Sequence, residues 1–240
     1  MIKQKFSLRG RFITPPGATR RQFLGRLALG SAAATVGMLA MPGVSRAQTT
    51  VWRFQSSWPQ KDIFHEIAHD YVQRVNSMAG SRLKLELLPA GAVVGALQIQ
   101  DAVHAGALEG GHAAVAYWYG KHKAFSMFGT TPPWGWDANM LLGWYYYGGG
   151  EALYHELVND MIKVNVISFF CCPQPTQPLG WFKKEIRTAD DLKGLKYRTI
   201  GLAADLFTEM GAAVTIMAGS DIVPAMDRGL LDGAEFNNPS

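Results

Sequence analysis

The chain has 240 residues, of which 48% are hydrophobic and 18% charged, so it can form one large domain or two small ones and is neither disordered nor charge-rich. Its formal net charge of +4 would favour a nucleic acid or an anionic membrane as a partner, but eight of the 23 basic residues precede Thr49 and all 19 acidic residues follow it. Residues 48–240 therefore carry 15 basic and 19 acidic side chains, a net charge of −4, and we expect no nucleic-acid partner.

Residues 1–47 have the three parts of a bacterial export signal. A basic stretch ends in the adjacent Arg20 and Arg21, which an apolar pair follows, as in the twin-arginine signals that export folded proteins. An apolar run rich in alanine and glycine covers 27–41, and it is shorter than the ~20 residues that a membrane anchor needs. We expect a cleaved signal at 1–47, export to the periplasm by the twin-arginine route, and a folded domain at 48–240.

Beyond the leader, the spacing of apolar residues predicts strands and helices in alternation. In chain order, we expect strand 51–57, helix 62–78, strand 83–88, helix 97–105, strand 113–118, helices 137–147 and 151–161, strand 164–170, strand 195–200, helix 203–210, strand 213–217, helix 222–228 and strand 231–236. This order predicts an α/β fold with mainly parallel sheets.

The first expected helix, 62–78, has an apolar residue every four positions. Ile63, Ile67 and Tyr71 would lie on one face, so we expect this face to pack on the core. Asp62 precedes the helix, where its negative charge favours the helix dipole.

The same helix contains a motif of zinc proteases, His65-Glu66-x-x-His69. In such enzymes both histidines bind zinc, and a third ligand follows downstream. Because the motif lies in the first helix after the leader, and a five-residue pattern often arises by chance, we keep an exported zinc-dependent hydrolase as the alternative function.

The two cysteines, Cys171 and Cys172, are adjacent. A disulfide between neighbours closes only a strained ring, and no other cysteine is available for a disulfide framework. We expect two small buried apolar residues, with a redox-active pair as the alternative.

Three polar side chains are placed for ligand binding. Gln177 lies in the loop after strand 164–170, Arg198 lies in strand 195–200, and Glu235 lies near the end of the last strand. Ligands of open α/β sheets bind beyond the carboxyl ends of the strands. We therefore expect the three side chains to converge in one cleft.

From Val51 onward the sequence resembles the extracytoplasmic solute-binding proteins of TRAP transporters. The resemblance is strongest in 87–91 (LLPAG), 194–198 (GLKYR) and 223–235 (VPAMDRGLLDGAE). The Gln177 loop and the segments 116–121 and 235–239 are similar to the subgroup that binds small 2-oxo or 2-hydroxy monocarboxylates.

The resemblance implies a fold of the periplasmic binding protein type, in which two α/β lobes close around the ligand. Members of the family run well beyond residue 240. We therefore expect a C-terminally truncated chain with an incomplete second lobe.

The resemblance also implies a substrate site. An arginine at the position of Arg198 pairs with the substrate carboxylate, which a planar guanidinium can bind through two parallel hydrogen bonds. Gln177, Tyr117, Trp118 and Asn238 are expected to contact the substrate as well.

A metal site is implied beside the substrate. In the monocarboxylate subgroup, a glutamine like Gln177, an acid like Glu235 and the carbonyl group of the next residue, here Phe236, hold a metal ion. Three oxygen ligands suit a hard cation, Na⁺ or Ca²⁺.

The function that follows is that of a receptor and not of an enzyme. We expect periplasmic capture of a pyruvate-like or lactate-like monocarboxylate, assisted by the metal, and its delivery to the membrane-embedded subunits of a TRAP-type secondary transporter. A homodimer stays open as the state of the full-length protein.

Overall fold

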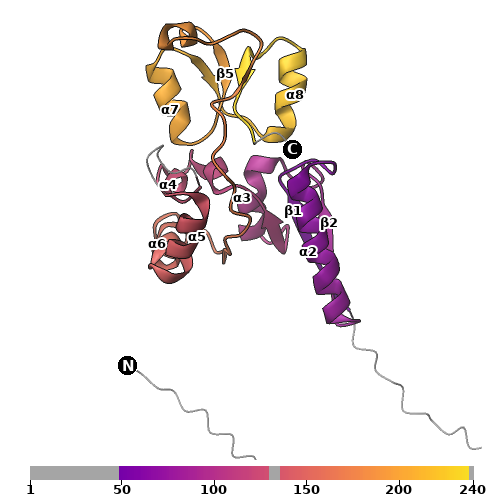
Figure 1. Ribbon diagram of the computed structural model, residues 1–240. Helices are drawn as coiled ribbons and strands as arrows, with labels where there is room; N and C mark the ends of the chain where they lie inside the picture. The colour runs from indigo at the N-terminus through magenta and orange to yellow at the C-terminus, as the bar shows by residue number, and fades with distance from the viewer. Residues whose placement is uncertain (1–48, 130–135, 238–240) are drawn as a thin grey trace, which may run out of the picture. The chain divides into compact units, whose positions relative to one another are not determined.

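The computed structural model describes residues 49–129 and 136–237, all of which belong to one unit, Ala47–Ser240 (Figure 1). The expected export signal at 1–47 and the expected substrate residue Asn238 lie outside the described residues. No helix in the described part is long and apolar enough to cross a membrane. The described residues form two sheets, each mainly parallel, as the sequence predicted.

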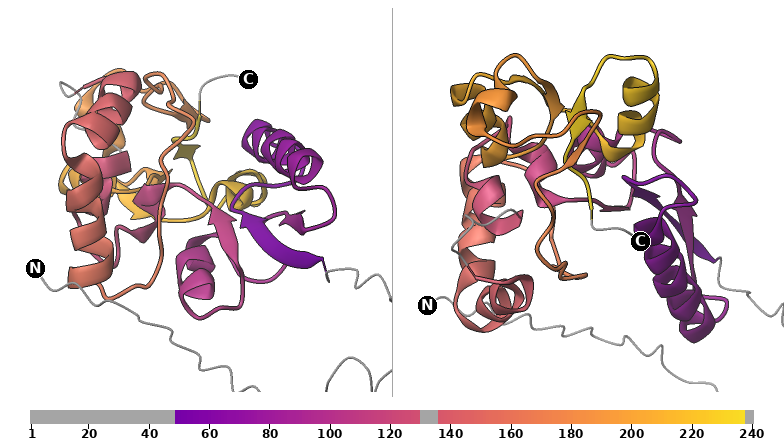
Figure 2. Two further views of the ribbon diagram at one scale, coloured as in Figure 1. Left: turned by 90° about the horizontal axis from the view of Figure 1, so that it is seen from below. Right: turned by 45° about the horizontal axis from the view of Figure 1, so that its top comes forward.

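The first sheet has three parallel strands in the order β2-β1-β3. Its elements are β1 (Thr50–Ser56), α2 (Ile63–Ala79), β2 (Leu83–Leu88), η1 (Ala96–Gln98), α3 (Ile99–His104) and β3 (Gly110–His112). α2 connects β1 to β2 and packs against β2 (Figure 2). Phe54 of β1 pairs with Gly110 of β3, and a Cβ on Gly110 would lie 2.4 Å from the Phe54 ring. Glycine at this position therefore lets β3 lie beside β1.

α2 packs on the core with a different face from the expected one. Ile63, Ile67 and Tyr71 are 44%, 43% and 57% exposed, so the prediction for this face was wrong. The Phe64 ring packs on Trp58 with 5.0 Å between the ring centroids, and this contact turns the neighbouring stripe inward. The side chains that α2 buries are those of Phe64, His65, Ala68 and Val72.

An aromatic cluster forms the core of the middle part of the chain. It is built from η2 (Val115–Trp118), α4 (Phe125–Gly129), α5 (Ala138–Tyr147), α6 (Gly150–His155) and the π-helical turn η3 (Glu156–Met161). Its fully buried rings include Phe125, Tyr145 and Tyr154. The expected helices 137–147 and 151–161 are confirmed, whereas residues 115–118 form a 3₁₀ helix instead of the expected strand 113–118.

Residues 164–170 were expected to form a strand, and this prediction was wrong. In the described part of the chain the segment has no strand partner. The Asn159 amide donates to the carbonyl oxygens of Val164 and Val166, at 2.7 and 3.0 Å, and the Phe170 ring stacks on Tyr145 at 4.0 Å. Side-chain contacts therefore hold the segment in place of a backbone ladder.

The second sheet has four strands in the order β4-β7-β5-β6. Its elements are β4 (Trp181–Phe182), η4 (Ala189–Leu192), β5 (Lys196–Arg198), α7 (Leu202–Glu209), β6 (Ala213–Thr215), α8 (Gly219–Asp227) and β7 (Gly233–Ala234). β5 runs parallel to β6 and β7, whereas β4 is antiparallel to β7. Tyr197 of β5 is fully buried between Phe182 and Phe207. This packing fixes the position of β5 and with it the position of Arg198, which follows Tyr197 in the strand.

Candidate functional site

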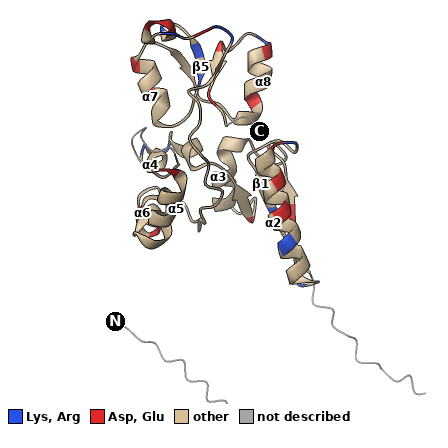
Figure 3. Ribbon diagram, viewed as in Figure 1, with Lys and Arg blue, Asp and Glu red and all other residues tan. Residues whose placement is uncertain are grey.

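Arg198 is the last residue of β5 and is only 1% exposed. Figure 3 shows that β5, which carries basic residues, lies between α7 and α8. The Nε and Nη2 of Arg198 donate to the carbonyl oxygen of Met217, at 3.0 and 2.8 Å, and the Nη1 of Arg198 donates to the carbonyl oxygen of Glu235 at 2.6 Å. The guanidinium therefore connects the ends of β5, β6 and β7.

Glu235 supplies the counter-charge of Arg198. Its Oε2 accepts a hydrogen bond from Arg198 Nη1 at 3.0 Å, and its backbone N–H donates to the carbonyl oxygen of Arg198 at 2.9 Å. Burial raises the pKa of the Glu235 carboxyl, and the charge of Arg198 and the hydroxyl of Thr199 lower it by less. Burial of the Arg198–Glu235 pair therefore costs desolvation free energy, and buried charged groups of this kind cluster at functional sites.

The three polar residues expected to converge do so. One terminal atom of the Gln177 amide lies 2.7 Å from Glu235 Oε1 and 2.8 Å from the carbonyl oxygen of Phe236. With nitrogen at that position the amide donates to both oxygens, and with oxygen there three oxygen atoms face one another. Amide orientation is assigned from its partners, so this side chain fits either two hydrogen bonds or a shared cation.

Of the two aromatic residues expected at the substrate, Tyr117 lies near Arg198. It is 8% exposed, and its hydroxyl accepts a hydrogen bond from the N–H of Gly219 at 3.3 Å. Burial raises the pKa of its hydroxyl, and the nearby charge of Arg198 lowers it. Trp118 instead packs against Phe125 in the aromatic cluster, with 5.8 Å between the ring centroids.

Contacts that the sequence did not suggest join the segment after Tyr117 to α7. The hydroxyl of Tyr119 donates to Asp205, and Lys123 Nζ donates to the same carboxylate oxygen at 2.5 Å. The backbone N–H of Leu202 donates to the Ser126 hydroxyl at 3.1 Å. None of these pairs has a sequence motif, since partners 76 to 86 residues apart are set by the fold alone.

Within the described part of the chain, the histidine motif of α2 belongs to no group of three ligand-type side chains close enough to share a metal ion. His65 is buried, whereas Glu66 and His69 are exposed and line a shallow pocket with it. Burial, followed by the charges of His69 and His112, lowers the pKa of His65. Among the described residues, the group of three ligand-type side chains close enough to share a metal ion is a different one, His112, Cys171 and Cys172.

Comparison with protein families and with curated proteins shows similarity to bacterial solute-binding proteins. The family model of the bacterial extracellular solute-binding proteins, family 7, matches residues 54–240. A monocarboxylate 2-oxoacid-binding periplasmic protein of Nostoc sp. (strain PCC 7120) is 35% identical over 224 residues, which are 92% of this chain and 60% of that protein. The chain thus spans about three fifths of the length of this curated relative.

The solved structures that are similar over 80% of this chain include two TRAP solute-binding proteins. One is a TRAP transporter solute-binding protein of Bordetella bronchiseptica with copurified calcium and picolinate, at 31% identity and a TM-score of 0.73 over 56% of its chain. The other is a TRAP periplasmic solute-binding protein of Pseudoalteromonas atlantica with bound sodium and pyruvate, at 34% identity and a TM-score of 0.72 over 57% of its chain.

Proposed function

Because this chain belongs to family 7 of the bacterial extracellular solute-binding proteins, we propose that it captures a small 2-oxo or 2-hydroxy monocarboxylate, such as pyruvate or lactate. The observation that carries the proposal is the convergence of Gln177, Arg198 and Glu235 at the ends of the strands of the second sheet. The family consists of solute receptors and not of enzymes. The Nostoc relative is named for 2-oxoacid binding, and the Pseudoalteromonas protein holds pyruvate.

Arg198 binds the carboxylate of the ligand in this proposal. A guanidinium has five N–H donors and stays charged when buried. Four hydrogen bonds join Arg198 to Met217 and Glu235, and with respect to the described residues one N–H of Nη2 is left for a ligand. A ligand that binds through two parallel hydrogen bonds must therefore displace one internal contact, and the Glu235 carboxylate is the acceptor that a second carboxylate can replace.

The oxygen atoms of Gln177, Glu235 and Phe236 fit Na⁺ or Ca²⁺. The Gln177 amide already has a terminal atom within 2.8 Å of both other oxygens, so the donor set comes together without rearrangement of the backbone. Carboxylate, amide and carbonyl oxygens are the ligands of hard cations. A bound cation would offset the negative charge of Glu235 and accept an oxygen of the 2-oxo or 2-hydroxy acid.

The remaining parts of the proposal concern the cell. We infer that residues 1–47 direct export by the twin-arginine route and that residues 48–240 form the solute-binding domain. The ligand is delivered to the membrane-embedded subunits of a TRAP-type transporter. For the full-length protein, a homodimer stays the open alternative. Asn238 completes the substrate site in this proposal. Trp118 supports the wall of that site through Tyr117, which precedes it in η2.

Calorimetric titration with pyruvate and lactate tests the carboxylate role. Arg198→Lys keeps the charge but loses the planar fork, so we expect affinity to fall by about 10- to 100-fold, the value of a charge-assisted hydrogen bond. Arg187→Lys is the matched control, because Arg187 is exposed and its side chain pairs with Glu185 on the surface. An unchanged affinity in a folded Arg198→Lys variant would refute the assignment.

The cation role has a separate test. Removal of Ca²⁺ with a chelator in sodium-free buffer should lower pyruvate affinity, and Gln177→Leu should abolish this dependence on the cation. If affinity is the same with and without both cations, Gln177, Glu235 and Phe236 hold no functional metal, and the carboxylate role of Arg198 still stands.

A further inference from the structure

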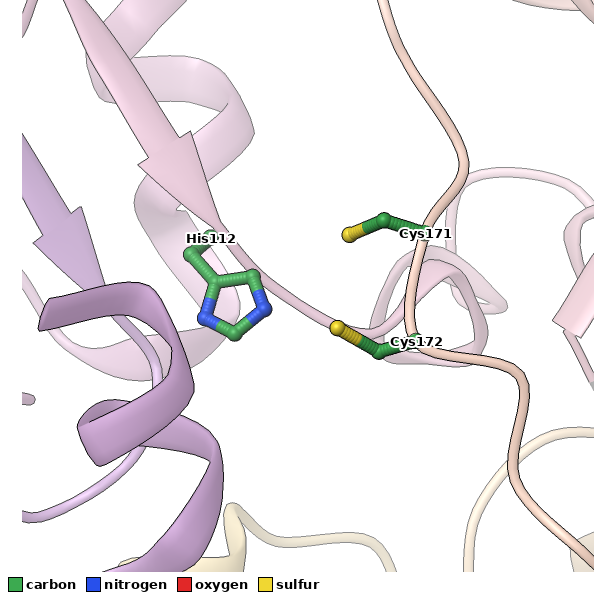
Figure 4. A group of neighbouring side chains, drawn as sticks. All are labelled: His112, Cys171 and Cys172. Atoms are coloured by element: carbon green, nitrogen blue, oxygen red, sulfur yellow. The ribbon is translucent and has the colours of Figure 1, made fainter. Parts of the chain in front are cut away.

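His112, Cys171 and Cys172 form a second cluster of chemically active side chains. Their ligand atoms all lie within 4.8 Å of one another, and Figure 4 shows the imidazole and both thiols turned toward a common centre. The cysteines are not buried apolar residues as expected, because Cys171 is exposed and Cys172 is half-buried. The carboxylate site uses none of these three residues.

The backbone at Cys172 explains why both thiols face the same side. Neighbouring side chains of an extended segment point in opposite directions. Cys172 has a φ of 55°, in the left-handed region that a residue other than glycine rarely adopts. This turn breaks the alternation and brings the Cys172 sulfur beside that of Cys171 (Figure 4). A strained residue of this kind is often kept for a site.

His112 is held in place before any ligand arrives. It ends β3, and its carbonyl oxygen accepts hydrogen bonds from the Ser57 N–H at 2.8 Å and the Ser57 hydroxyl at 3.1 Å. Its ring packs on Trp58 with 4.8 Å between the centroids. His112 Nδ1 is buried and has no hydrogen-bond partner among the described residues.

We propose that His112, Cys171 and Cys172 bind a thiophilic metal ion, Zn²⁺ or Cu⁺. Thiolate and imidazole ligands select these ions over Na⁺ and Ca²⁺. A tetrahedral zinc ion with bonds of about 2.0–2.3 Å holds its ligand atoms roughly 3.5–3.8 Å apart. Side-chain rotations that move the ligand atoms by about 1 Å would therefore bring them to this spacing. Three protein ligands leave one position open, and the exposed Cys171 gives the ion a path from solvent.

The charge balance of the cluster supports this assignment. Binding of Zn²⁺ by the two cysteines as thiolates releases two protons and gives a neutral site with the neutral imidazole.

Zinc titration against a chromophoric chelator tests the proposal on the purified chain, with a phosphine reductant present because a disulfide would remove both thiolates. We expect one Zn²⁺ per chain. Loss of an outer partner of a metal ligand costs about 10–100-fold in affinity, so loss of a ligand itself, in Cys172→Ser or His112→Gln, should cost at least about 100-fold. His69→Gln is the matched control and should leave zinc affinity unchanged.

A second measurement does not depend on how the variants fold. Zinc should protect both cysteines of the unaltered chain from alkylation, and Co²⁺ should give the near-ultraviolet absorption of thiolate ligation. The proposal is overturned if both thiols stay reactive with zinc present, or if His69→Gln lowers zinc affinity as much as Cys172→Ser. The proposed monocarboxylate function would be unaffected by either outcome.

Discussion

Replacement of Arg198 by methionine removes the guanidinium and keeps an apolar stem of similar length. Three acceptors then lose their donor, namely the carbonyl oxygens of Met217 and Glu235 and the Glu235 carboxylate. Removal of one partner of a buried ion pair costs about 3–5 kcal/mol. With a urea m-value of about 2 kcal/mol/M, we expect the unfolding midpoint to fall by roughly 2 M.

The matched control has the same chemistry on the surface. Arg187 pairs with Glu185 at 2.8 Å, close to the 3.0 Å of Arg198 and Glu235, but their side chains are 76% and 68% exposed, against 1% and 16%. Arg187→Met should leave the midpoint unchanged within error, because solvent screens an exposed pair. Urea unfolding followed by circular dichroism measures both variants. Equal shifts in the two variants would show that burial does not set the strength of the Arg198 contacts.

Two further predictions concern Glu235 and the start of α2. Burial raises the pKa of Glu235 above its ordinary value of 4.5. The stability of the unaltered chain relative to Glu235→Gln should therefore be greatest below pH 4.5 and should decline as the pH rises through the raised pKa. Urea midpoints of both chains between pH 4 and 8 measure this difference, and a difference that does not change with pH would contradict the prediction. Asp62 caps α2 by accepting from the N–H of Phe64 at 2.9 Å, so Asp62→Ala should cost about 1 kcal/mol, whereas Asp70→Ala, which breaks an exposed pair with Arg74, should cause no measurable change in thermal unfolding.

Local signals in the sequence were sufficient for most helices and for the order of the elements. Asp62, the acidic residue before α2, marks the start of that helix through a contact two residues away. Local signals did not determine which face of α2 packs on the core. Two neighbouring stripes repeat every four residues, and the Phe64 contact with Trp58 selects one of them.

The strand predictions show a similar limit. A run of apolar residues at 164–170 has the composition of a strand, but a strand needs a partner, and among the described residues the segment is held by Asn159 and Tyr145 instead. Residues 115–118 wind into a 3₁₀ helix, and Val115 and Trp118 pack against the aromatic cluster rather than on the face of a sheet.

The sequence by itself determined the charge division between residues 1–47 and 48–240, the α/β order of the elements, and the family resemblance that singled out Gln177, Arg198 and Glu235. Only the tertiary structure decided that Arg198 is anchored on the carbonyl of Met217, and that His112 meets Cys171 and Cys172. Both depend on contacts between distant segments, and the second also depends on a left-handed turn at Cys172. Periodicity records which face a residue takes within its own element, and it carries no information on which element that face will meet.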